Sequence, residues 1–311
     1  MGYELSVINS KISSAPSAYI NACEAAFNKS VEAAAQVAAQ NLGRSPIILL
    51  SGPSGSGKTT TAKKITNALE QLGITAHNVS LDNYFLTINA ETAPKTPEGE
   101  IDYESPKCLD MDLLNKHFAQ LAAGEEIAIP HFSFQEQERI DGRVVPMKLN
   151  HNEMVIFEGI HALNDCITFE HPKAFKIYVS TMTDIVDNGI IIVEGAGLRL
   201  VRRLVRDAFF RGAEPEFTLQ MWKNVRRGEQ QNIIPFKDTA DLKIDTALPY
   251  EISVLKRFSR GVFDKVDEGT EHFKELDQVM NAFPCFEEID DAAIPADSIL
   301  REFIGGSSFT Y

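Results

Sequence analysis

Residues with the chemistry to hold phosphate gather between positions 52 and 60. The segment reads Gly-Pro-Ser-Gly-Ser-Gly-Lys-Thr-Thr and follows the apolar run 46–51. Glycines let the backbone curl so that successive N–H groups face one anion, and a following helix adds the positive end of its dipole. Lys58 can then reach the outer phosphates of a nucleotide, and the Thr59 hydroxyl can bind Mg²⁺. The residues predicted to bind the nucleotide are Gly52, Ser54, Gly55, Ser56, Gly57, Lys58, Thr59 and Thr60.

A carboxylate follows the next expected strand, which covers residues 74–81. Asp82 comes directly after it. Open α/β sheets bind ligands outside the carboxyl ends of their strands, so this position predicts a side chain that faces the phosphates. The alternative is a carboxylate that caps the next turn.

An arginine-rich helix is predicted over residues 198–211. With 3.6 residues per turn, Arg199, Arg203 and Arg206 share a face and Arg202 lies beside them. Such a helix near a phosphate-binding loop suits clamping of a phosphoryl group. The alternative is pairing with acids such as Asp207 at helical spacing.

The elements that must position these residues alternate between strands and helices. Buried strands are expected at 47–51, 154–157, 174–180 and 242–246, the first of them central; 190–193 could be a strand or a packed loop. A small β-hairpin is expected from segments 127–134 and 143–149, joined by the charged turn 135–142. Helices are expected at 17–41, 60–72, 110–123, 198–211, 215–227, 250–258, 271–283 and 298–304. The pattern predicts a mainly parallel, three-layer α/β sandwich with a small hairpin lobe and a helical C-terminal extension.

Composition indicates a soluble, cytoplasmic protein. The 311 residues carry 30 Lys and Arg against 44 Asp and Glu, a net charge of −14. That sign argues against a broad nucleic-acid or membrane surface. We see no signal peptide or membrane-length apolar run, and the start Met1–Ser6 matches a myristoylation pattern only loosely. The four cysteines are far apart, which is typical of reduced, buried thiols.

Four motifs, taken together in this order, resemble the uridine kinase and phosphoribulokinase family of P-loop kinases. They are the 52–59 loop, Asp82, the run Phe157-Glu158-Gly159-Ile160 after a later strand, and the Arg-Arg-Leu-Val-Arg-Asp run with Arg211-Gly212. The likeness covers about residues 47–256, and the first helix and the tail 300–306 resemble bacterial uridine kinase-like proteins. The resemblance implies an ATP- and Mg²⁺-dependent kinase with a small-molecule acceptor.

The resemblance also implies a role for each matching residue. Asp82 matches the catalytic carboxylate that takes the proton of the acceptor hydroxyl and lies near the metal, and Glu158 matches an acid that helps hold Mg²⁺. Lys58, Arg203, Arg206 and Arg211 match the groups that close on the phosphates. The acceptor is expected to contact Tyr84, Tyr103, Glu104, Phe132, Gln137 and Arg139, with Glu104 on ribose hydroxyls.

The hairpin departs from the uridine kinase pattern in two positions. Phe132 stands where uridine kinases carry a tyrosine and Gln137 where they carry a histidine, both of which read the pyrimidine. The leading hypothesis is phosphorylation of the 5′-hydroxyl of uridine, cytidine or a related nucleoside. A phosphopentose or another small hydroxylated metabolite is the alternative acceptor, and a nucleotide-binding regulator that transfers nothing is a third reading.

The chain is expected to divide into an N-terminal helical segment (1–44), a kinase domain (45–258) and a C-terminal helical extension (259–311). The sequence leaves open the acceptor, the choice between ATP and GTP, the formation of a homo-oligomer and the role of the extension.

Overall fold

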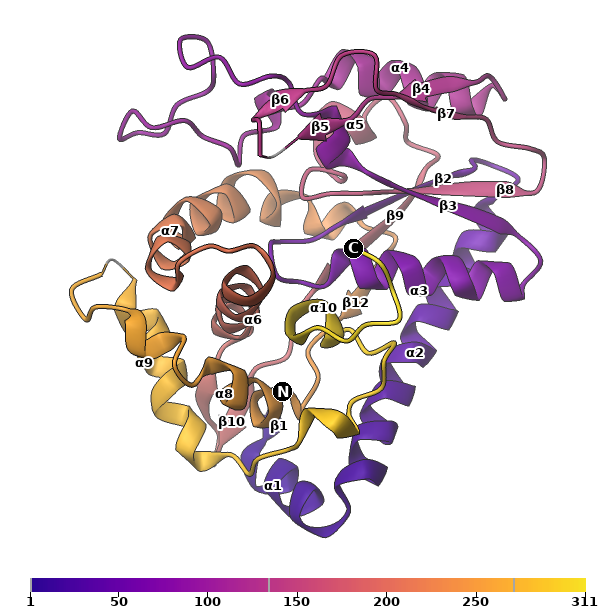
Figure 1. The fold of residues 1–311 in the computed structure, drawn as a ribbon. Coiled ribbons are helices and arrows are strands. Elements are labelled where there is room, and N and C mark those ends of the chain that lie inside the picture. The colour runs from indigo at the N-terminus through magenta and orange to yellow at the C-terminus, as the bar shows by residue number, and fades with distance from the viewer. Residues whose placement is uncertain (1, 134, 271) are drawn as a thin grey trace.

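The strand that precedes the phosphate-binding loop lies at the centre of a parallel sheet (Figure 1). The structure, a computed structural model, describes residues 2–133, 135–270 and 272–311. The sheet consists of β2 (Ile47–Ser51), β3 (Thr75–Ser80), β8 (Glu153–Glu158), β9 (Phe175–Ser180) and β12 (Leu242–Asp245). Their order is β12-β9-β2-β8-β3, and all neighbouring pairs are parallel. The predicted α/β fold with a central P-loop strand is confirmed.

Helices connect these strands and extend the chain at both ends. The expected first helix begins at Pro16 and is preceded by α1, which the sequence analysis missed; Glu271, the expected start of a later helix, lies outside the described residues. The helices are α1 (Leu5–Ser14), α2 (Pro16–Asn41), α3 (Lys58–Gln71), α4 (Met111–Ala122), α5 (Asp165–Thr168), α6 (Gly195–Phe210), α7 (Pro215–Asn232), α8 (Glu251–Ser259), α9 (Phe273–Ala282) and α10 (Arg301–Ile304).

The side chains of β2 alternate between two hydrophobic cores, one on each face of the sheet. Ile48 and Leu50 belong to a core with residues of α2, α3, α6 and α8. Ile47 and Leu49 belong to a second core with residues of α4 and the hairpin lobe. Because successive strand residues point to opposite faces, a strand buried on both sides is apolar on both, as residues Ile47–Leu50 of β2 are. This arrangement holds the loop after β2 rigidly between the two layers.

The hairpin lobe differs in detail from the expected single hairpin. β4 (Ile127–Ile129) pairs with β7 (Val145–Met147), and β5 (Phe132–Ser133) pairs with β6 (Glu138–Arg139), both antiparallel. The first ladder ends at Ile129, and the second begins at Phe132. β6 therefore lies inside the segment expected to be a turn, and Phe134, the expected end of one β segment, lies outside the described residues.

A small sheet lies away from the main one. It contains β1 (Tyr3–Glu4), β10 (Ile185–Asp187) and β11 (Ile190–Val193), in that order. The segment left open between strand and loop is therefore a strand. A sequence signal existed: Asn188-Gly189 joins β10 and β11, both residues have positive φ (51° and 82°), and Asn-Gly favours such a two-residue hairpin turn.

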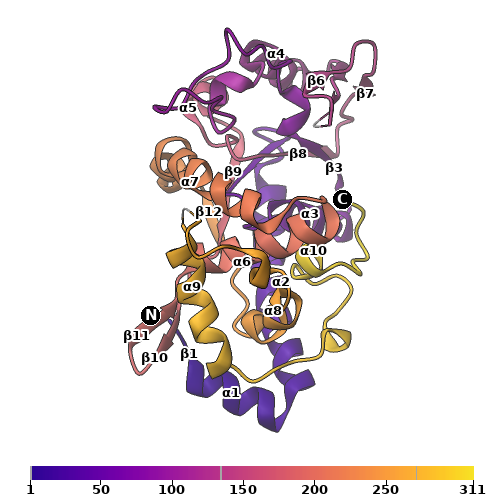
Figure 2. The same cartoon turned by 60° about the vertical axis from the view of Figure 1, so that its left-hand side comes forward.

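The C-terminal extension returns to the start of α3 (Figures 1 and 2). One hydrophobic core contains residues from all three expected segments, including Ile20, Ile65 and Phe303. The division at residues 44 and 258 stays a prediction, but the extension packs on the same core as the kinase segment.

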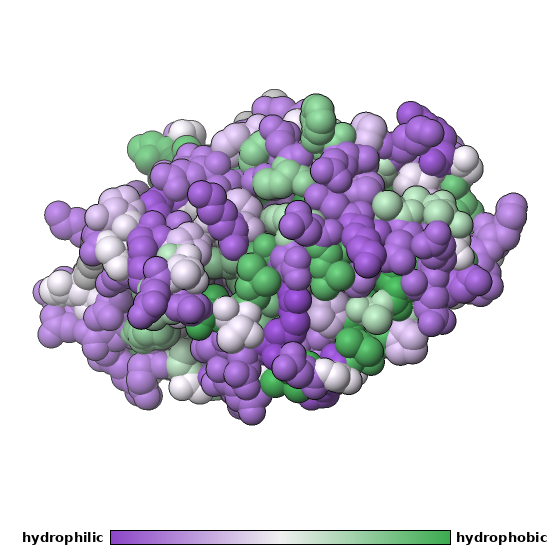
Figure 3. Space-filling view, turned by 90° about the horizontal axis from the view of Figure 1, so that it is seen from above, coloured by the Kyte–Doolittle hydropathy of each residue, from purple (hydrophilic) through white to green (hydrophobic). Residues whose placement is uncertain are grey.

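The surface carries two of the cysteines that were expected to be buried. Cys166 and Cys285 are exposed and Cys23 is half-buried, so that expectation holds only for Cys108; all four are free thiols. No helix in the described ranges is long and apolar enough to cross a bilayer. From the side of the hairpin lobe the surface is mostly hydrophilic, with small hydrophobic patches between charged side chains (Figure 3).

Candidate active site

The loop between β2 and α3 has the conformation that a phosphate cradle requires. Gly55 and Gly57 have φ of 76° and 78°, in the left-handed region that side chains disfavour. A Cβ at Gly52 would lie 2.0 Å from the carbonyl oxygen of Val179, so only glycine fits there. The Ser56 hydroxyl is buried and has no hydrogen-bond partner among the described residues. The loop thus has the backbone conformation and a buried hydroxyl that suit the binding of an anion.

A cavity of about 160 Å³ opens beside this loop. It brings together residues from five segments that are far apart in the sequence, and most of the residues predicted to act on phosphate are among them. The lining residues are Ser54, Gly55, Gly57, Lys58, Thr59, Asp82, Glu158, Gly159, Ile160, Arg206, Arg211 and Glu302. Glu302, from the C-terminal extension, was not predicted.

Asp82 lies at the end of β3 and faces this cavity. The turn that follows the strand is capped by Ser80, whose Oγ accepts a hydrogen bond from the Asp82 N–H at 3.3 Å. A capping role for the Asp82 carboxylate is therefore not needed. Burial raises the pKa of the Asp82 carboxyl above its ordinary value, and the positive charges of Lys58 and Arg211 oppose this shift.

Opposite charges crowd the cavity floor. Burial lowers the pKa of Lys58, and the carboxylates of Glu158 and Asp82 act in the opposite direction. Burial also raises the pKa of Glu158 to about 7, with Lys58 opposing the shift. The Glu158 Oε1 accepts a hydrogen bond of 3.5 Å from the Thr59 hydroxyl. The floor therefore holds opposite charges that a metal ion and a phosphate group could stabilise.

This shift predicts how stability depends on pH. Glu158 binds its proton more tightly in the folded protein (pKa about 7) than in the unfolded chain (about 4.5), so the free energy of unfolding falls as the pH rises between these values. We expect Glu158→Gln, without nucleotide, to match the wild type near pH 4.5 and to be more stable by roughly 1–3 kcal/mol at pH 8. Urea unfolding at both pH values measures this.

A matched control lies on the same strand. Asn150 donates hydrogen bonds to Glu153, which lower the pKa of that carboxyl. The ionised Glu153 carboxylate stabilises the folded protein at pH values above its pKa in the unfolded chain, and this stabilisation is lost on acidification. Glu153→Gln should therefore be less stable than the wild type at pH 8. If Glu158→Gln were also less stable than the wild type at pH 8, the carboxylate would have a stabilising structural role and the prediction would be wrong.

Three of the predicted phosphate-clamping arginines surround one buried acid. The distances to the carboxylate of Asp207 are 3.4 Å from Arg203, 2.9 Å from Arg206 and 3.7 Å from Arg211. One carboxylate balances only one of three positive charges, so the group keeps an excess of positive charge at the cavity. Arg203 also donates to the Ser54 hydroxyl at 2.8 Å.

Two other arginines of α6 have a structural role instead. Arg199 pairs with Glu229 at 2.7 Å and Arg202 pairs with Glu251 at 2.6 Å, all four side chains being buried. Both arginines also donate to carbonyl oxygens of the phosphate loop, Arg199 to Ser54 and Arg202 to Gly55. They hold the loop from behind, so the idea that this whole arginine face clamps phosphate is corrected. The partners lie about 30 and 50 residues away, beyond any local pattern.

The loop of residues 98–104 is named the acceptor loop here, because Tyr103 and Glu104 in it are predicted to contact the acceptor. Side chains of α7 hold this loop in place. Arg227 donates to Asp102 at 3.0 Å, and Asn232 donates to the Glu104 carbonyl oxygen at 2.9 Å. A Cβ at Gly228 would lie 2.3 Å from that of Glu104, so glycine permits this close approach. Burial raises the pKa of the Glu104 carboxyl to about 7, and the positive charges of Arg203 and Lys58 oppose this shift. Glu104 is therefore close enough to the phosphate-binding loop to feel the charge of Lys58. Tyr103, beside it, is exposed.

The remaining predicted acceptor contacts lie mostly in the hairpin lobe. Tyr84 is fully buried, and its hydroxyl lies 2.9 Å from Nδ1 of His117. Phe132 is buried against Phe85, with ring centroids 5.4 Å apart. Both rings pack in the second hydrophobic core, so their contact with an acceptor stays a prediction.

Arg139 and Gln137 lie at the rim of the same lobe. Arg139 pairs with Asp110 at 2.8 Å and donates to the Tyr84 carbonyl oxygen at 3.1 Å, which ties β6 to the start of α4. A direct contact between Arg139 and an acceptor would have to break that pair. Gln137 is exposed and has a φ of 57°.

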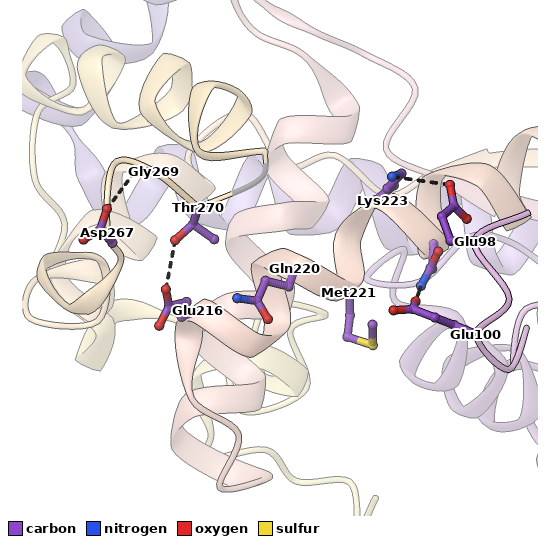
Figure 4. Close-up of a pocket in the computed structure, with 10 residues that line it drawn as sticks. Glu98, Glu100, Glu216, Gln220, Met221, Lys223, Asp267, Gly269 and Thr270 are labelled. Carbon is purple, nitrogen blue, oxygen red and sulfur yellow. Dashed lines mark hydrogen bonds and ion pairs between the residues drawn. The ribbon is translucent and has the colours of Figure 1, made fainter. Parts of the chain in front are cut away.

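A larger cavity of about 640 Å³ lies next to the acceptor loop and is strongly acidic (Figure 4). Glu98 and Glu100 line one side, where Glu98 pairs with Lys223 at 3.5 Å. Glu216 and Thr270 line the other side and are hydrogen-bonded to each other at 3.1 Å. This charge would repel an anionic molecule that approached from that direction.

The floor of the smaller cavity suits a magnesium ion bound together with a nucleotide. In the described ranges, no group of three or more His, Cys, Asp or Glu side chains could hold a metal alone. Mg²⁺ in kinases, however, is bound by one or two carboxylates, a hydroxyl, waters and the phosphates themselves. The Thr59 hydroxyl, Asp82 and Glu158, together with the unpaired Ser56 hydroxyl, supply such a partial set.

Several known proteins are similar to this chain in sequence or fold. The uridine kinase of Halobacterium salinarum is 30% identical over 63% of this chain and 77% of its own length. That of Schizosaccharomyces pombe is 28% identical over 60% of this chain, which spans 37% of the relative. The structure of D-glycerate 3-kinase from Cryptococcus neoformans matches with a TM-score of 0.47 and 15% identity, over 67% of this chain and 89% of that one.

The model of the Phosphoribulokinase / Uridine kinase family matches residues 47–252, which include the loop, Asp82, Glu158 and the arginines of α6. The chain belongs to the Phosphoribulokinase / Uridine kinase family of P-loop kinases.

Proposed function

We propose that this protein transfers the γ-phosphoryl group of ATP, with Mg²⁺, to the 5′-hydroxyl of uridine, cytidine or a related nucleoside. The observation that carries the proposal is the cavity beside the loop, where Lys58, Asp82 and Arg206 meet. An ammonium group, a carboxylate and a guanidinium group around one space are the parts that phosphoryl transfer needs.

The proposed reaction is mostly positioning and neutralisation of charge. The acceptor oxygen bonds to the γ-phosphorus as the bond to the β–γ bridging oxygen breaks, which leaves ADP, and Asp82 takes the hydroxyl proton. Lys58 holds the outer phosphates, while Arg206 and Arg211 neutralise charge on the transferred group. Thr59, Asp82 and Glu158 would hold Mg²⁺, which when bound neutralises charge on the β- and γ-oxygens.

The charges around the acceptor loop favour a neutral acceptor over a phosphorylated one. Four acids lie between Glu98 and Glu104, and Glu98 and Asp102 both pair with Arg227. Arg139, the nearest basic residue of the hairpin, is paired with Asp110. A sugar phosphate would meet paired cations and net negative charge, whereas ribose hydroxyls could donate to the Glu104 carboxylate.

The experiment is ADP release with Mg·ATP and a panel of nucleosides, phosphopentoses and small polyols, with Lys58→Ala as the inactive control. Stimulation by uridine or cytidine would support the proposal and make exposed Gln137 the candidate to read the base. Stimulation by sugar phosphates alone would show that the protein is a kinase but that its acceptor is a sugar phosphate and not a nucleoside. ATP binding without turnover on any acceptor would favour a nucleotide-binding regulator and reject the proposal.

A further inference from the structure

A carboxylate from the C-terminal extension occupies the N-terminus of α3, where a nucleotide phosphate is expected. Oε2 of Glu302 accepts hydrogen bonds from the Thr60 N–H at 3.2 Å and from the Thr60 hydroxyl at 2.6 Å. Glu302 lies in α10, 242 residues after Thr60 in the sequence, and outside the part of the chain that the family model matches. It also lines the cavity with Lys58 and Arg211.

The position of this contact is a phosphate position for a physical reason. The first N–H of α3 with a partner inside the helix is that of Thr61, which donates to the Gly57 carbonyl oxygen at 3.0 Å. The Thr60 N–H is therefore the last donor of the first turn that has no partner inside the helix, and such donors hold the anion in a P-loop. Burial lowers the pKa of Lys58 and raises that of Glu158; the negative charge of Glu302 opposes the first shift and adds to the second, so it acts on the same cavity floor. A nucleotide phosphate and this carboxylate would repel each other at one donor.

Several contacts hold the extension in this place. Arg301 donates to the carbonyl oxygens of Asp291 and Ile294, at 2.8 and 2.7 Å. The hydroxyl of Tyr311 lies 2.9 Å from that of Thr60. Ile299 sits so close to the loop that a Cβ at Gly57 would lie 2.3 Å from its Cδ1. The tail thus packs against the predicted nucleotide site, and both Glu302 and Tyr311 contact Thr60.

We propose that Glu302 sets the affinity for the nucleotide: its carboxylate is an intramolecular anion that the nucleotide phosphates must displace from Thr60. This inference rests on the proposed ATP site and adds the extension to it. ATP binding then competes with the tail. The measured association constant is the intrinsic constant multiplied by the fraction of molecules in which the tail is displaced from Thr60, so a tail that is rarely displaced weakens binding.

A role as a simple helix cap makes a different prediction. Glutamine at 302 keeps an oxygen that can accept from Thr60, so a cap would survive with little change in stability or in ATP affinity. If Glu302 competes with phosphate, the same change removes the repelling charge. We therefore expect Glu302→Gln to lower the Kd for ATP on the order of 10-fold, the effect of one charge-assisted hydrogen bond, with an unfolding midpoint close to that of the wild type.

The experiment is calorimetric titration of the full chain with ATP, with inorganic tripolyphosphate and with adenosine. The matched control is Glu268→Gln, the same charge change at an exposed site of the extension. Tighter binding of ATP and of tripolyphosphate, but not of adenosine, by Glu302→Gln alone would support the inference. Equal affinities in wild type and variant would reduce Glu302 to a cap, and weaker binding would make it a ligand of the nucleotide; either result overturns the inference.

The same titrations separate this inference from the proposed function. Failure of the wild type and of Glu302→Gln to bind either phosphate compound would reject the ATP site and, with it, the inference. Binding of ATP by the wild type with no effect of Glu302→Gln would reject only the inference. Turnover is not needed for either reading.

Discussion

Asp82→Asn is expected to lower kcat by about 10²- to 10⁴-fold, the usual effect of a positioned acid or base. The amide keeps the size of the side chain but cannot take the proton of the acceptor hydroxyl. Its position supports the choice: Asp82 faces the cavity, Ser80 caps the adjacent turn, and the charges of Lys58 and Arg211 act on its carboxyl. Steady-state ADP release with the acceptor found in the panel measures the change.

The control is Asp112→Asn, which makes the same charge change on the exposed side of α4. It should leave kcat and KM within about twofold, since surface substitutions rarely change the fold. Titration with ATP should give Asp82→Asn a Kd within a few-fold of the wild type, because the loop and Lys58 are intact. A variant with a normal kcat would exclude Asp82 as the base, and a complete loss of ATP binding would assign it to the nucleotide site instead.

The parts of the site that the sequence predicts are those that depend on local order. The phosphate loop needs residues 52–60 in one run. Asp82 follows the end of β3, and Glu158 is the last residue of β8, whose apolar run is plain in the sequence. The parallel sheet then brings these strand ends together. Glu302 has no such signal, because its contact with Thr60 depends on where a distant tail packs.

The hairpin lobe and helix α6 show that a sequence pattern does not predict which distant side chains a residue contacts. The family resemblance predicts that Phe132 and Arg139 contact the acceptor, but the ring of Phe132 is buried and Arg139 is ion-paired. Helical spacing places Arg199 and Arg203 on one face. It does not show that Glu229, from another helix, pairs with Arg199. The small β1-β10-β11 sheet is hard to predict for a similar reason, since a strand of two residues has no measurable period.

Arg202→Met is expected to lower the free energy of unfolding by about 3–5 kcal/mol, the effect of removing one partner of a buried ion pair. Arg202 and Glu251 are both fully buried, and two hydrogen bonds of 2.6 and 2.9 Å join them. Without the guanidinium group, Glu251 would stay in a site whose burial already raises its pKa. The Gly55 and Thr246 carbonyl oxygens would also lose a donor. Urea unfolding measures the loss.

Two further variants separate charge pairing from catalysis. Arg211→Met removes an arginine that is 60% exposed, so it should change stability by less than about 0.5 kcal/mol while it lowers kcat. The double variant Arg202→Met, Glu251→Leu removes both charges and should regain most of the stability that the single variant lost, because apolar side chains can replace a buried pair. If the double variant were no more stable than the single one, the bond from Arg202 to the Gly55 carbonyl oxygen would be the stabilising contact. The arginine would then act through the loop backbone, and the double variant should also bind ATP more weakly.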